Sequence, residues 1–212
     1  MNPAVQISQY IADFASSPLA QWSSLSPWEM TTRSAEIVRA LLPSLIADDF
    51  IITDEIAVHR STFVESGATL KGPLIVGASG YVAAGTYLRG GNWVADRCTF
   101  GPGAELKSSF VFGGTKLAHF NFVGDSIVGA DVNLEAGSIV CNYRNERSSK
   151  QVMARVNGVL VSTGCEKFGA LIGDGARLGA NSVVAPGALL ARNSIIRRTE
   201  LCDQEQEQEQ EQ

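Results

Sequence analysis

A bulky apolar residue recurs at every sixth position over the stretch from Val58 to Phe112. No helix has a period of six, and an ordinary β-hairpin does not repeat at so short an interval. Each group of six residues therefore forms one short strand with a turn, which buries its apolar residue by stacking on its neighbours. The sequence predicts an all-β solenoid. The repeat positions are Val58, Val64, Leu70, Val76, Val82, Leu88, Val94, Phe100, Leu106 and Phe112.

The same interval returns twice further along the chain, and the gaps between the runs are informative. The interval shortens to five residues after Phe112 and after Val123, and it is lost over residues 144–167. Loops that interrupt a solenoid usually lie on its binding face. We therefore expect a solenoid over residues 51–200 with a functional loop insertion at 144–167. The later repeat positions are Val128, Leu134 and Val140, then Ile172, Leu178, Val184, Leu190 and Ile196.

Residues 1–50 lack this interval and contain helix signals instead. The segment Ser26-Pro27-Trp28-Glu29 is a capping box that leads into apolar residues at helical spacing, which predicts a helix over 27–42. Apolar residues at positions i, i+4 and i+7 predict an earlier helix over 3–15. We expect this helical cap to cover the open end of the solenoid, whose first coil would otherwise expose an unpaired sheet edge. Docking of a partner is the alternative role.

The net charge of the chain, −5, is equal to the charge of its last ten residues, which hold five acids and no base. We expect the acidic tail at 201–212 to be disordered. Because residues 1–202 sum to zero (−5 minus −5), neither nucleic acid nor an anionic membrane is expected as the main partner. The four cysteines show no CxxC spacing, and no long apolar segment is present. These features favour a reduced, cytoplasmic protein without a membrane span.

Two cations, Arg89 and Lys107, each directly follow an inward apolar residue of the repeat. Successive strand side chains alternate in direction, so the residue after each inward apolar residue points outward. If three repeats close one coil, Arg89 and Lys107 stack on neighbouring coils, about 4.8 Å apart. The sequence shows no carboxylate in phase with them, so such a pair suits a phosphate group. Two separately solvated surface cations are the alternative.

His119 lies twelve residues after Lys107, close to the first shortening of the interval. An imidazole titrates near neutral pH, so it suits removal of a proton from an amine. Taken alone, such a histidine is more often structural than catalytic. The other histidine, His59, has no partner suggested by spacing, and we interpret it as structural.

Residues 116–143 read KLAHFNFVGDSIVGADVNLEAGSIVCNY. This stretch resembles the acetyltransferase half of the bifunctional glucosamine-1-phosphate N-acetyltransferase / N-acetylglucosamine-1-phosphate uridylyltransferase enzymes. It is more similar still to the archaeal-type sugar-1-phosphate nucleotidylyltransferases with the same C-terminal domain. The pattern begins at 27–29 (PWE) and continues through 156–164 (VNGVLVSTG) and 167–173 (KFGALIG). The resemblance implies a left-handed parallel β-helix, a homotrimer and active sites between subunits.

The resemblance also implies roles for individual residues. His119 matches the general base of the family, and Arg89 and Lys107 match its sugar-phosphate ligands, in agreement with the stacked cations. Asn133 and Asn142 match residues that bind the amino sugar in the family, and Ala136 matches a backbone position near the acyl thioester. We also place Lys167, Ala170 and Ala180 at the acetyl-CoA, where Lys167 either meets the CoA phosphates or is a solvated surface residue.

The chain departs from the family pattern at two positions. Phe122 replaces a tyrosine whose hydroxyl contacts the phosphate, and Ser148 replaces a lysine. Lys150 is near enough in sequence to take over from that lysine. The acceptor can therefore differ from glucosamine-1-phosphate.

The implied activity is direct transfer of an acetyl group from acetyl-CoA to an amino-sugar phosphate, with His119 as the base. A metal is not expected, because a three-histidine site needs more than the two histidines present. Cys141 is interpreted as a packing residue and not as a nucleophile, and Arg177 either meets CoA phosphates or is a solvated surface residue. The alternatives are a non-catalytic trimeric scaffold and an acyltransferase for a different amino or hydroxyl acceptor.

Overall fold

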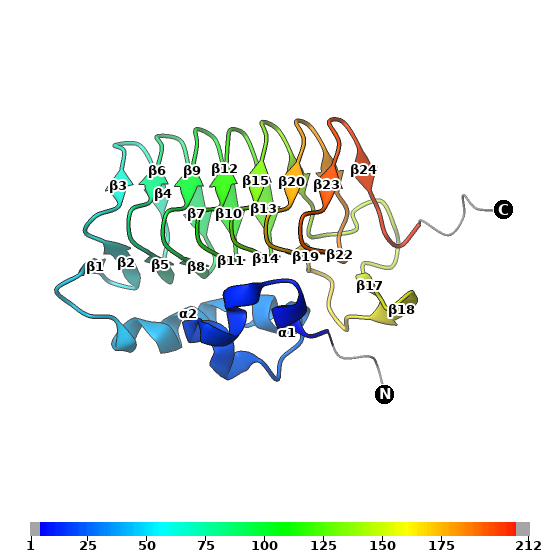
Figure 1. Cartoon of the computed structure of the whole chain (residues 1–212), viewed down its shortest axis with the longest axis horizontal. Helices are drawn as coiled ribbons and strands as arrows, with labels where there is room; N and C mark the ends of the chain where they lie inside the picture. Colours follow the sequence, from blue (N-terminus) through cyan, green and yellow to red (C-terminus); the bar gives the residue numbers. More distant parts are fainter. Residues whose placement is uncertain (1–4, 207–212) are drawn as a thin grey trace.

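The computed structural model describes residues 5–206, whose successive coils stack into a solenoid with three parallel sheets as its faces (Figure 1). Each coil contributes one strand to each sheet, and these sheets are called A, B and C here. Sheet A contains β1 (Phe50–Thr53), β2 (Ile56–His59), β5 (Leu74–Val76), β8 (Asn92–Val94), β11 (Phe110–Val111), β14 (Ile127–Val128), β19 (Ala170–Ile172) and β22 (Ala188–Leu190).

Sheets B and C follow sheet A in every coil. Sheet B contains β3 (Phe63–Val64), β6 (Tyr81–Val82), β9 (Thr99–Phe100), β12 (Lys116–Leu117), β15 (Asn133–Leu134), β20 (Arg177–Leu178) and β23 (Ile195–Ile196). Sheet C contains β4 (Thr69–Leu70), β7 (Tyr87–Arg89), β10 (Glu105–Lys107), β13 (Phe122–Gly124), β16 (Ile139–Val140), β21 (Val183–Val184) and β24 (Leu201–Cys202). The predicted all-β fold, a left-handed β-helix, is confirmed.

The apolar repeat forms the interior of the solenoid, with one correction. Val94 pairs with Val111, so the shortened step falls between Leu106 and Val111, one repeat earlier than predicted. A shift of one residue turns a side chain to the opposite face of its strand. Phe112 therefore lies outside the inner column, where its ring packs on Trp93 with the centroids 5.3 Å apart.

The N-terminal segment forms short helices. The capping box is present, with the Ser26 N–H donating to the Glu29 carboxylate over 2.7 Å. The predicted helix over 27–42 is divided in two at Arg33. The predicted helix over 3–15 is wrong, because Ile11 adopts an extended conformation that separates two 3-10 turns. Residues 3 and 4 of that prediction lie outside the described residues. The helices are η1 (Ile7–Gln9), η2 (Ala12–Ser16), η3 (Pro18–Trp22), α1 (Pro27–Thr32), α2 (Ser34–Leu41) and η4 (Leu42–Ser44).

These helices lie along the outer face of sheet A and do not cap the end of the solenoid, which corrects the expectation (Figure 1). Strands of sheet A are apolar on both faces, so the outer face must be covered by a second layer. Trp93, Phe110 and Leu171 pack there against the helices. Gly91 allows the close approach, since its φ is +93° and a Cβ there would lie 2.5 Å from a backbone nitrogen of α2.

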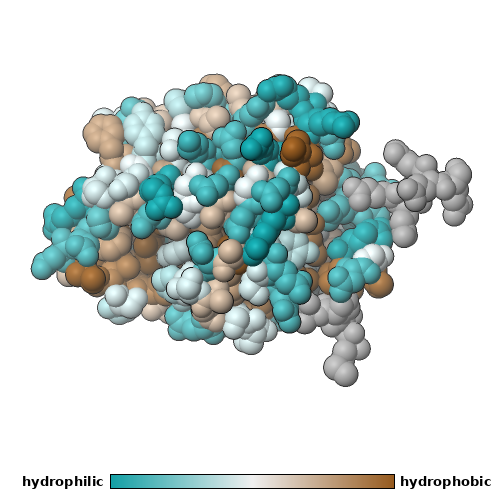
Figure 2. Space-filling view, viewed as in Figure 1, coloured by the Kyte–Doolittle hydropathy of each residue, from teal (hydrophilic) through white to brown (hydrophobic). Residues whose placement is uncertain are grey.

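Other segments close the two ends of sheet A. At the N-terminal end β1 pairs antiparallel with β2, and it leaves Ile51 and Ile52 exposed. Figure 2 shows hydrophobic residues at this end of the molecule. At the C-terminal end, the Gln204 side chain accepts from the Leu189 N–H (2.8 Å) and donates to its carbonyl (3.0 Å), as a further strand would.

The start of the acidic tail and the insertion both contain β-strands. Leu201–Cys202 forms β24 and Asp203 is buried, so the expected disorder of 201–212 is wrong for residues 201–206; residues 207–212 lie outside the described part. The insertion contains an antiparallel hairpin of β17 (Met153–Val156) and β18 (Val159–Ser162) that packs near β22. Within residues 5–206, no helix has both the length and the apolarity needed to cross a membrane.

Candidate active site

The two predicted cations lie side by side on the outer surface of sheet C. Arg89 of β7 and Lys107 of β10 occupy paired register positions, as the interval predicted. Each has a carboxylate partner, however, which the sequence analysis missed. The Arg89 guanidinium lies 2.6 Å from a Glu105 oxygen, and the Lys107 ammonium lies 2.7 Å from an Asp125 oxygen. The cations therefore do not face each other uncompensated.

Both carboxylates have a physical explanation. Glu105 is two residues before Lys107 on the same strand, so it points to the same face. Asp125 follows Gly124, the residue that pairs with Lys107, and adopts φ +46° at the corner between sheets C and A. The side-chain exposure of Lys107 is 18% and that of Asp125 is 8%, so water screens this pair weakly. The charge pair is fixed before any ligand binds.

Asp125 also brings Asn142 to the same place. The Asn142 side-chain amide donates a hydrogen bond to the Asp125 carboxylate, while Lys107 donates to both carboxylate oxygens over 2.7 and 2.9 Å. Gly124 leaves room for this arrangement, because a Cβ there would lie 2.7 Å from the Asn142 amide nitrogen and 2.8 Å from the Phe122 ring. Three predicted acceptor residues, Lys107, Phe122 and Asn142, therefore lie together.

His119 lies at the corner between β12 and β13, where sheet B turns into sheet C. Its side chain is exposed, and its backbone carbonyl accepts the Gly137 N–H over 2.9 Å. The imidazole forms no hydrogen bond or ion pair with residues 5–206, so both ring nitrogens are available. His59 differs: its Nδ1 lies 2.8 Å from the Ser61 hydroxyl and its ring packs on Phe50, which supports a structural role.

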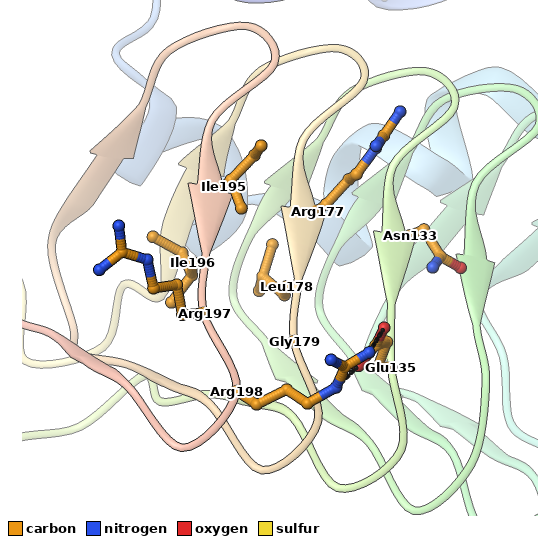
Figure 3. A pocket seen from close by; sticks show the side chains of 9 residues that line it. All are labelled: Asn133, Glu135, Arg177, Leu178, Gly179, Ile195, Ile196, Arg197 and Arg198. Carbon is orange, nitrogen blue, oxygen red and sulfur yellow. Dashed lines mark hydrogen bonds and ion pairs between the residues drawn. The ribbon is translucent and has the colours of Figure 1, made fainter.

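A second group of predicted residues lies on sheet B and lines a cavity of about 490 Å³ (Figure 3). Asn133 and Arg177 occupy paired positions of β15 and β20. Arg198 points toward Glu135 and forms an ion pair of 2.9 Å with it. Arg177 and Arg197 have no carboxylate within ion-pair distance among the described residues. The structure thus separates Asn133 from Asn142, which follows β16 of sheet C.

The predicted alanine positions differ in their access. Ala136 lies at the corner after β15, where its carbonyl accepts the Asn181 N–H over 3.0 Å, and the Ala180 N–H donates to Glu135 over 2.9 Å. Both are therefore close to the sheet B cavity. Ala170 is fully buried in β19, and its N–H donates to the Ser126 hydroxyl over 3.1 Å. Ala170 presents no free group to a ligand in this chain.

The structure places the two predicted loop lysines apart. Lys167 lines a cavity of about 410 Å³ with Lys107 and Asp125, between the α1–α2 corner and sheet C, and so lies with the acceptor group and not with the sheet B cavity. Lys150 is held inside its own loop, donating to the Asn145 carbonyl over 2.8 Å and to the Arg147 carbonyl. Lys167, not Lys150, is therefore placed to assist Lys107.

Neither a cysteine nucleophile nor a metal centre emerges from the described residues. Burial raises the pKa of the Cys98 thiol to about 12, and burial also raises the pKa of the Cys141 and Cys165 thiols. A thiol must ionise to act as a nucleophile, so these groups are poorly suited to attack. In residues 5–206, no three His, Cys, Asp or Glu side chains are grouped as metal ligands.

The chain is similar to several known proteins, although no family model matches it. A bifunctional sugar-1-phosphate nucleotidylyltransferase/acetyltransferase of Sulfurisphaera tokodaii is 31% identical over 151 residues, which cover 71% of this chain and 37% of that protein. A bifunctional protein GlmU of Methanococcus vannielii is 28% identical, with coverage of 89% and 46%. The acetyltransferase domain of PglB from Neisseria gonorrhoeae covers 87% of this chain and 69% of that chain at 15% identity and a TM-score of 0.36, too distant to bear on function.

The repeat and the three parallel sheets identify a left-handed β-helix built from hexapeptide repeats. Among known proteins, the chain is similar to GlmU-type bifunctional proteins, including archaeal ones. This confirms the family resemblance noted in the sequence. The chain spans less than half the length of these relatives.

Proposed function

We propose that this chain transfers an acetyl group from acetyl-CoA to the amine of an amino-sugar phosphate such as glucosamine-1-phosphate. The observation that supports this most strongly is the Lys107–Asp125–Asn142 network on sheet C, next to Arg89 and on the same solenoid surface as Phe122. It combines cations for a phosphate with an amide and a carboxylate for a sugar amine and hydroxyls.

In this proposal the acceptor phosphate binds Arg89 and Lys107, with Lys167 as a third cation. Lys167 then supplies the contact that Ser148 cannot make, because it lines the cavity that holds Lys107. Glu105 and Asp125 keep the two stacked cations in fixed positions, so little side-chain entropy is lost when the phosphate binds. Phe122 provides an apolar surface for the sugar ring in place of a hydroxyl.

The reaction is a direct acyl transfer. The His119 imidazole removes a proton from the acceptor ammonium group or from the attacking nitrogen, which bonds to the thioester carbonyl carbon of acetyl-CoA. The carbon–sulfur bond then breaks, and the CoA thiolate leaves and takes up the proton that the His119 imidazole removed from the nitrogen. Backbone N–H groups near Ala136 stabilise the negative charge on the carbonyl oxygen. No protein nucleophile takes part.

The sheet B cavity suits the phosphate groups of acetyl-CoA. Arg177 and Arg197 line it without carboxylate partners in residues 5–206, while Ile195 offers apolar contact. Guanidinium groups bind phosphate oxygens through paired hydrogen bonds. CoA would lie along sheet B, with its thioester end toward Ala136, Ala180 and the corner that carries His119.

The separation of the two groups supports a site shared between copies of the chain, in a homotrimer. Asn133 is on sheet B, whereas Lys107 is on sheet C and Asn142 follows its strand β16. His119 lies at the corner between these sheets. One chain therefore cannot surround a ligand with both groups. A neighbouring copy whose sheet B faces this sheet C would complete the site.

A non-catalytic scaffold is the second candidate, and one observation favours it. Arg89 and Lys107 are already paired with carboxylates, so a phosphate must compete with Glu105 and Asp125 for them. A scaffold needs no free cations on this surface. The two candidates differ in whether the chain turns over acetyl-CoA.

The experiment measures release of the CoA thiol from acetyl-CoA with glucosamine-1-phosphate, galactosamine-1-phosphate and glucosamine as acceptors. We expect turnover that requires the phosphate, and a loss of kcat of about 10²–10⁴ in His119→Ala. His59→Ala is the matched control, because it removes the other imidazole of the chain. Absence of turnover with all amino-sugar phosphates, together with retained CoA binding, would refute the proposal and favour the scaffold.

A further inference from the structure

The C-terminal residues 203–206 are held against the insertion by a dense set of charge-assisted contacts, which we call the C-terminal clasp. Its members are Arg144, Arg147 and Arg155 of the insertion and Asp203, Gln204 and Glu205 of the C-terminal segment. The proposed reaction does not use any of these residues. They nevertheless join a segment far along the chain to the loop that follows Asn142.

Arg144 is the centre of the clasp. Its side chain is 3% exposed, and its guanidinium donates to both oxygens of Asp203 over 2.7 and 2.8 Å. It also donates to the Pro186 carbonyl over 3.1 Å and lies 3.1 Å from Glu205. Asp203 is almost as buried, at 8%. Asp203 supplies the two shortest contacts of this buried charge, so losing its carboxylate would weaken the hold on Arg144.

Two further arginines attach the same segment. Arg147 donates to both oxygens of Glu205 over 2.6 and 2.9 Å. Arg155, in strand β17, donates to the Gln204 carbonyl over 2.8 Å. Paired contacts between a guanidinium and a carboxylate fix orientation as well as distance. The clasp therefore holds both the first part of the insertion and its hairpin.

The insertion begins and ends at proposed acceptor residues. Asn142 lies two residues before Arg144, and Lys167 closes the insertion beside Lys107. The two ends are joined directly, since the Phe168 N–H donates to the Asn142 carbonyl over 3.2 Å. A displacement of Arg144 would therefore be transmitted to the backbone of Asn142, and through it to Lys167.

We propose that Asp203 and Arg144 are positioning residues, and that the C-terminal clasp sets the geometry of the acceptor site by holding the first part of the insertion and its hairpin. The far end of the insertion follows through the Phe168–Asn142 hydrogen bond. This inference rests on the proposed acceptor role of Asn142 and Lys167. It assigns a function in catalysis to the C-terminal segment, which touches no reacting atom. The sheet B cavity does not include the insertion, so the acetyl-CoA site is independent of the clasp.

The test uses Asp203→Asn in the full chain, which keeps the shape of the side chain but removes its charge. We expect the KM for glucosamine-1-phosphate to rise roughly tenfold while the KM for acetyl-CoA changes by less than about twofold. Hydrogen–deuterium exchange should become faster in residues 143–151 and 163–168 and remain unchanged in residues 105–125.

Two control variants separate positioning from general stability. Glu55→Gln alters a paired contact of similar geometry but greater exposure, with Arg39 (2.6 and 3.0 Å), at a place remote from the insertion, and should leave both KM values unchanged. Val82→Ala lowers stability through the buried core of an early coil without touching the clasp. If Val82→Ala raises the acceptor KM as much as Asp203→Asn does, the positioning role is refuted.

The remaining outcomes keep the two proposals distinct. Unchanged exchange at 143–151 and 163–168 in Asp203→Asn would overturn the inference whatever the activity. Faster exchange with an unchanged acceptor KM, or with an equal rise in the acetyl-CoA KM, would overturn it too. If the unaltered chain turns over no amino-sugar phosphate, the proposed function fails, whereas faster exchange at both ends of the insertion would still support the clasp as the element that holds them.

Discussion

Removal of the Asp125 carboxylate is the most informative perturbation of the sheet C surface. In Asp125→Ala, the Lys107 ammonium loses both of its carboxylate contacts, of 2.7 and 2.9 Å, and the Asn142 amide loses its acceptor. Breaking one side of a buried ion pair costs about 3–5 kcal/mol. Because Lys107 keeps 18% exposure and can partly rehydrate, we expect a loss near the lower end, about 3 kcal/mol.

That loss corresponds to a fall in Tm of about 6–12 °C for a chain of this size. Replacing both charges removes the unpaired ammonium, so Lys107→Met/Asp125→Leu should recover more than half of the lost stability. Glu36→Ala provides the control: it breaks an ion pair with Arg33 that is 64% exposed on the Glu36 side, and no measurable change is expected.

Urea unfolding followed by circular dichroism, at one fixed protein concentration, gives the free energy of unfolding of all four proteins. A loss below about 1 kcal/mol in Asp125→Ala would contradict a buried, mutually dependent pair. Equal losses in the single and double variants would contradict the assignment of the effect to the unpaired Lys107 charge.

Three further predictions concern other parts of the molecule. Hydrogen bonds from the Arg144 guanidinium lower the pKa of the Asp203 carboxyl. Its contribution to stability is therefore present above the unfolded pKa of about 3.9 and is lost as the pH falls through the lower folded pKa. Acid unfolding of Asp203→Asn should lack this loss of stability below about pH 4. Arg177→Ala and Arg197→Ala should each raise the KM for acetyl-CoA about threefold to tenfold without affecting the acceptor KM, and an effect on the acceptor alone would contradict the sheet B placement. Gly91→Ala should lower the free energy of unfolding by more than about 1 kcal/mol, because φ is +93° and a Cβ would meet the backbone of α2; unchanged denaturation curves would show that the helices are not packed there.

Features that depend on residues close in sequence could be predicted well. The capping box at Ser26 formed because its two hydrogen bonds join residues three positions apart. The stacking of Arg89 on Lys107 followed from the repeat, because an inward residue and its outward neighbour alternate within each short strand.

Features that depend on how the chain packs were predicted less well. Glu105 and Asp125 neutralise the two cations through contacts between coils. Glu105 shares the outward face of β10 with Lys107, but Asp125 lies at a corner after β13, where the alternation of strand side chains gives no signal. Asp203 belongs to an acidic, repetitive tail, and only the presence of Arg144 beside it explains its burial. Lys167 reached the acceptor group because the insertion folds back and returns its end to Asn142.

The sequence by itself determined the solenoid, since a period of six leaves a chain no other regular way to bury one apolar residue per repeat. It also determined which sheet surface carries Arg89 and Lys107. The tertiary structure decided where the helices lie, because the outer face of sheet A, rather than the end of the solenoid, required a second apolar layer. It decided as well that the insertion and the C-terminal segment form one unit, because buried charges are stable only where their partners from distant parts of the chain meet them.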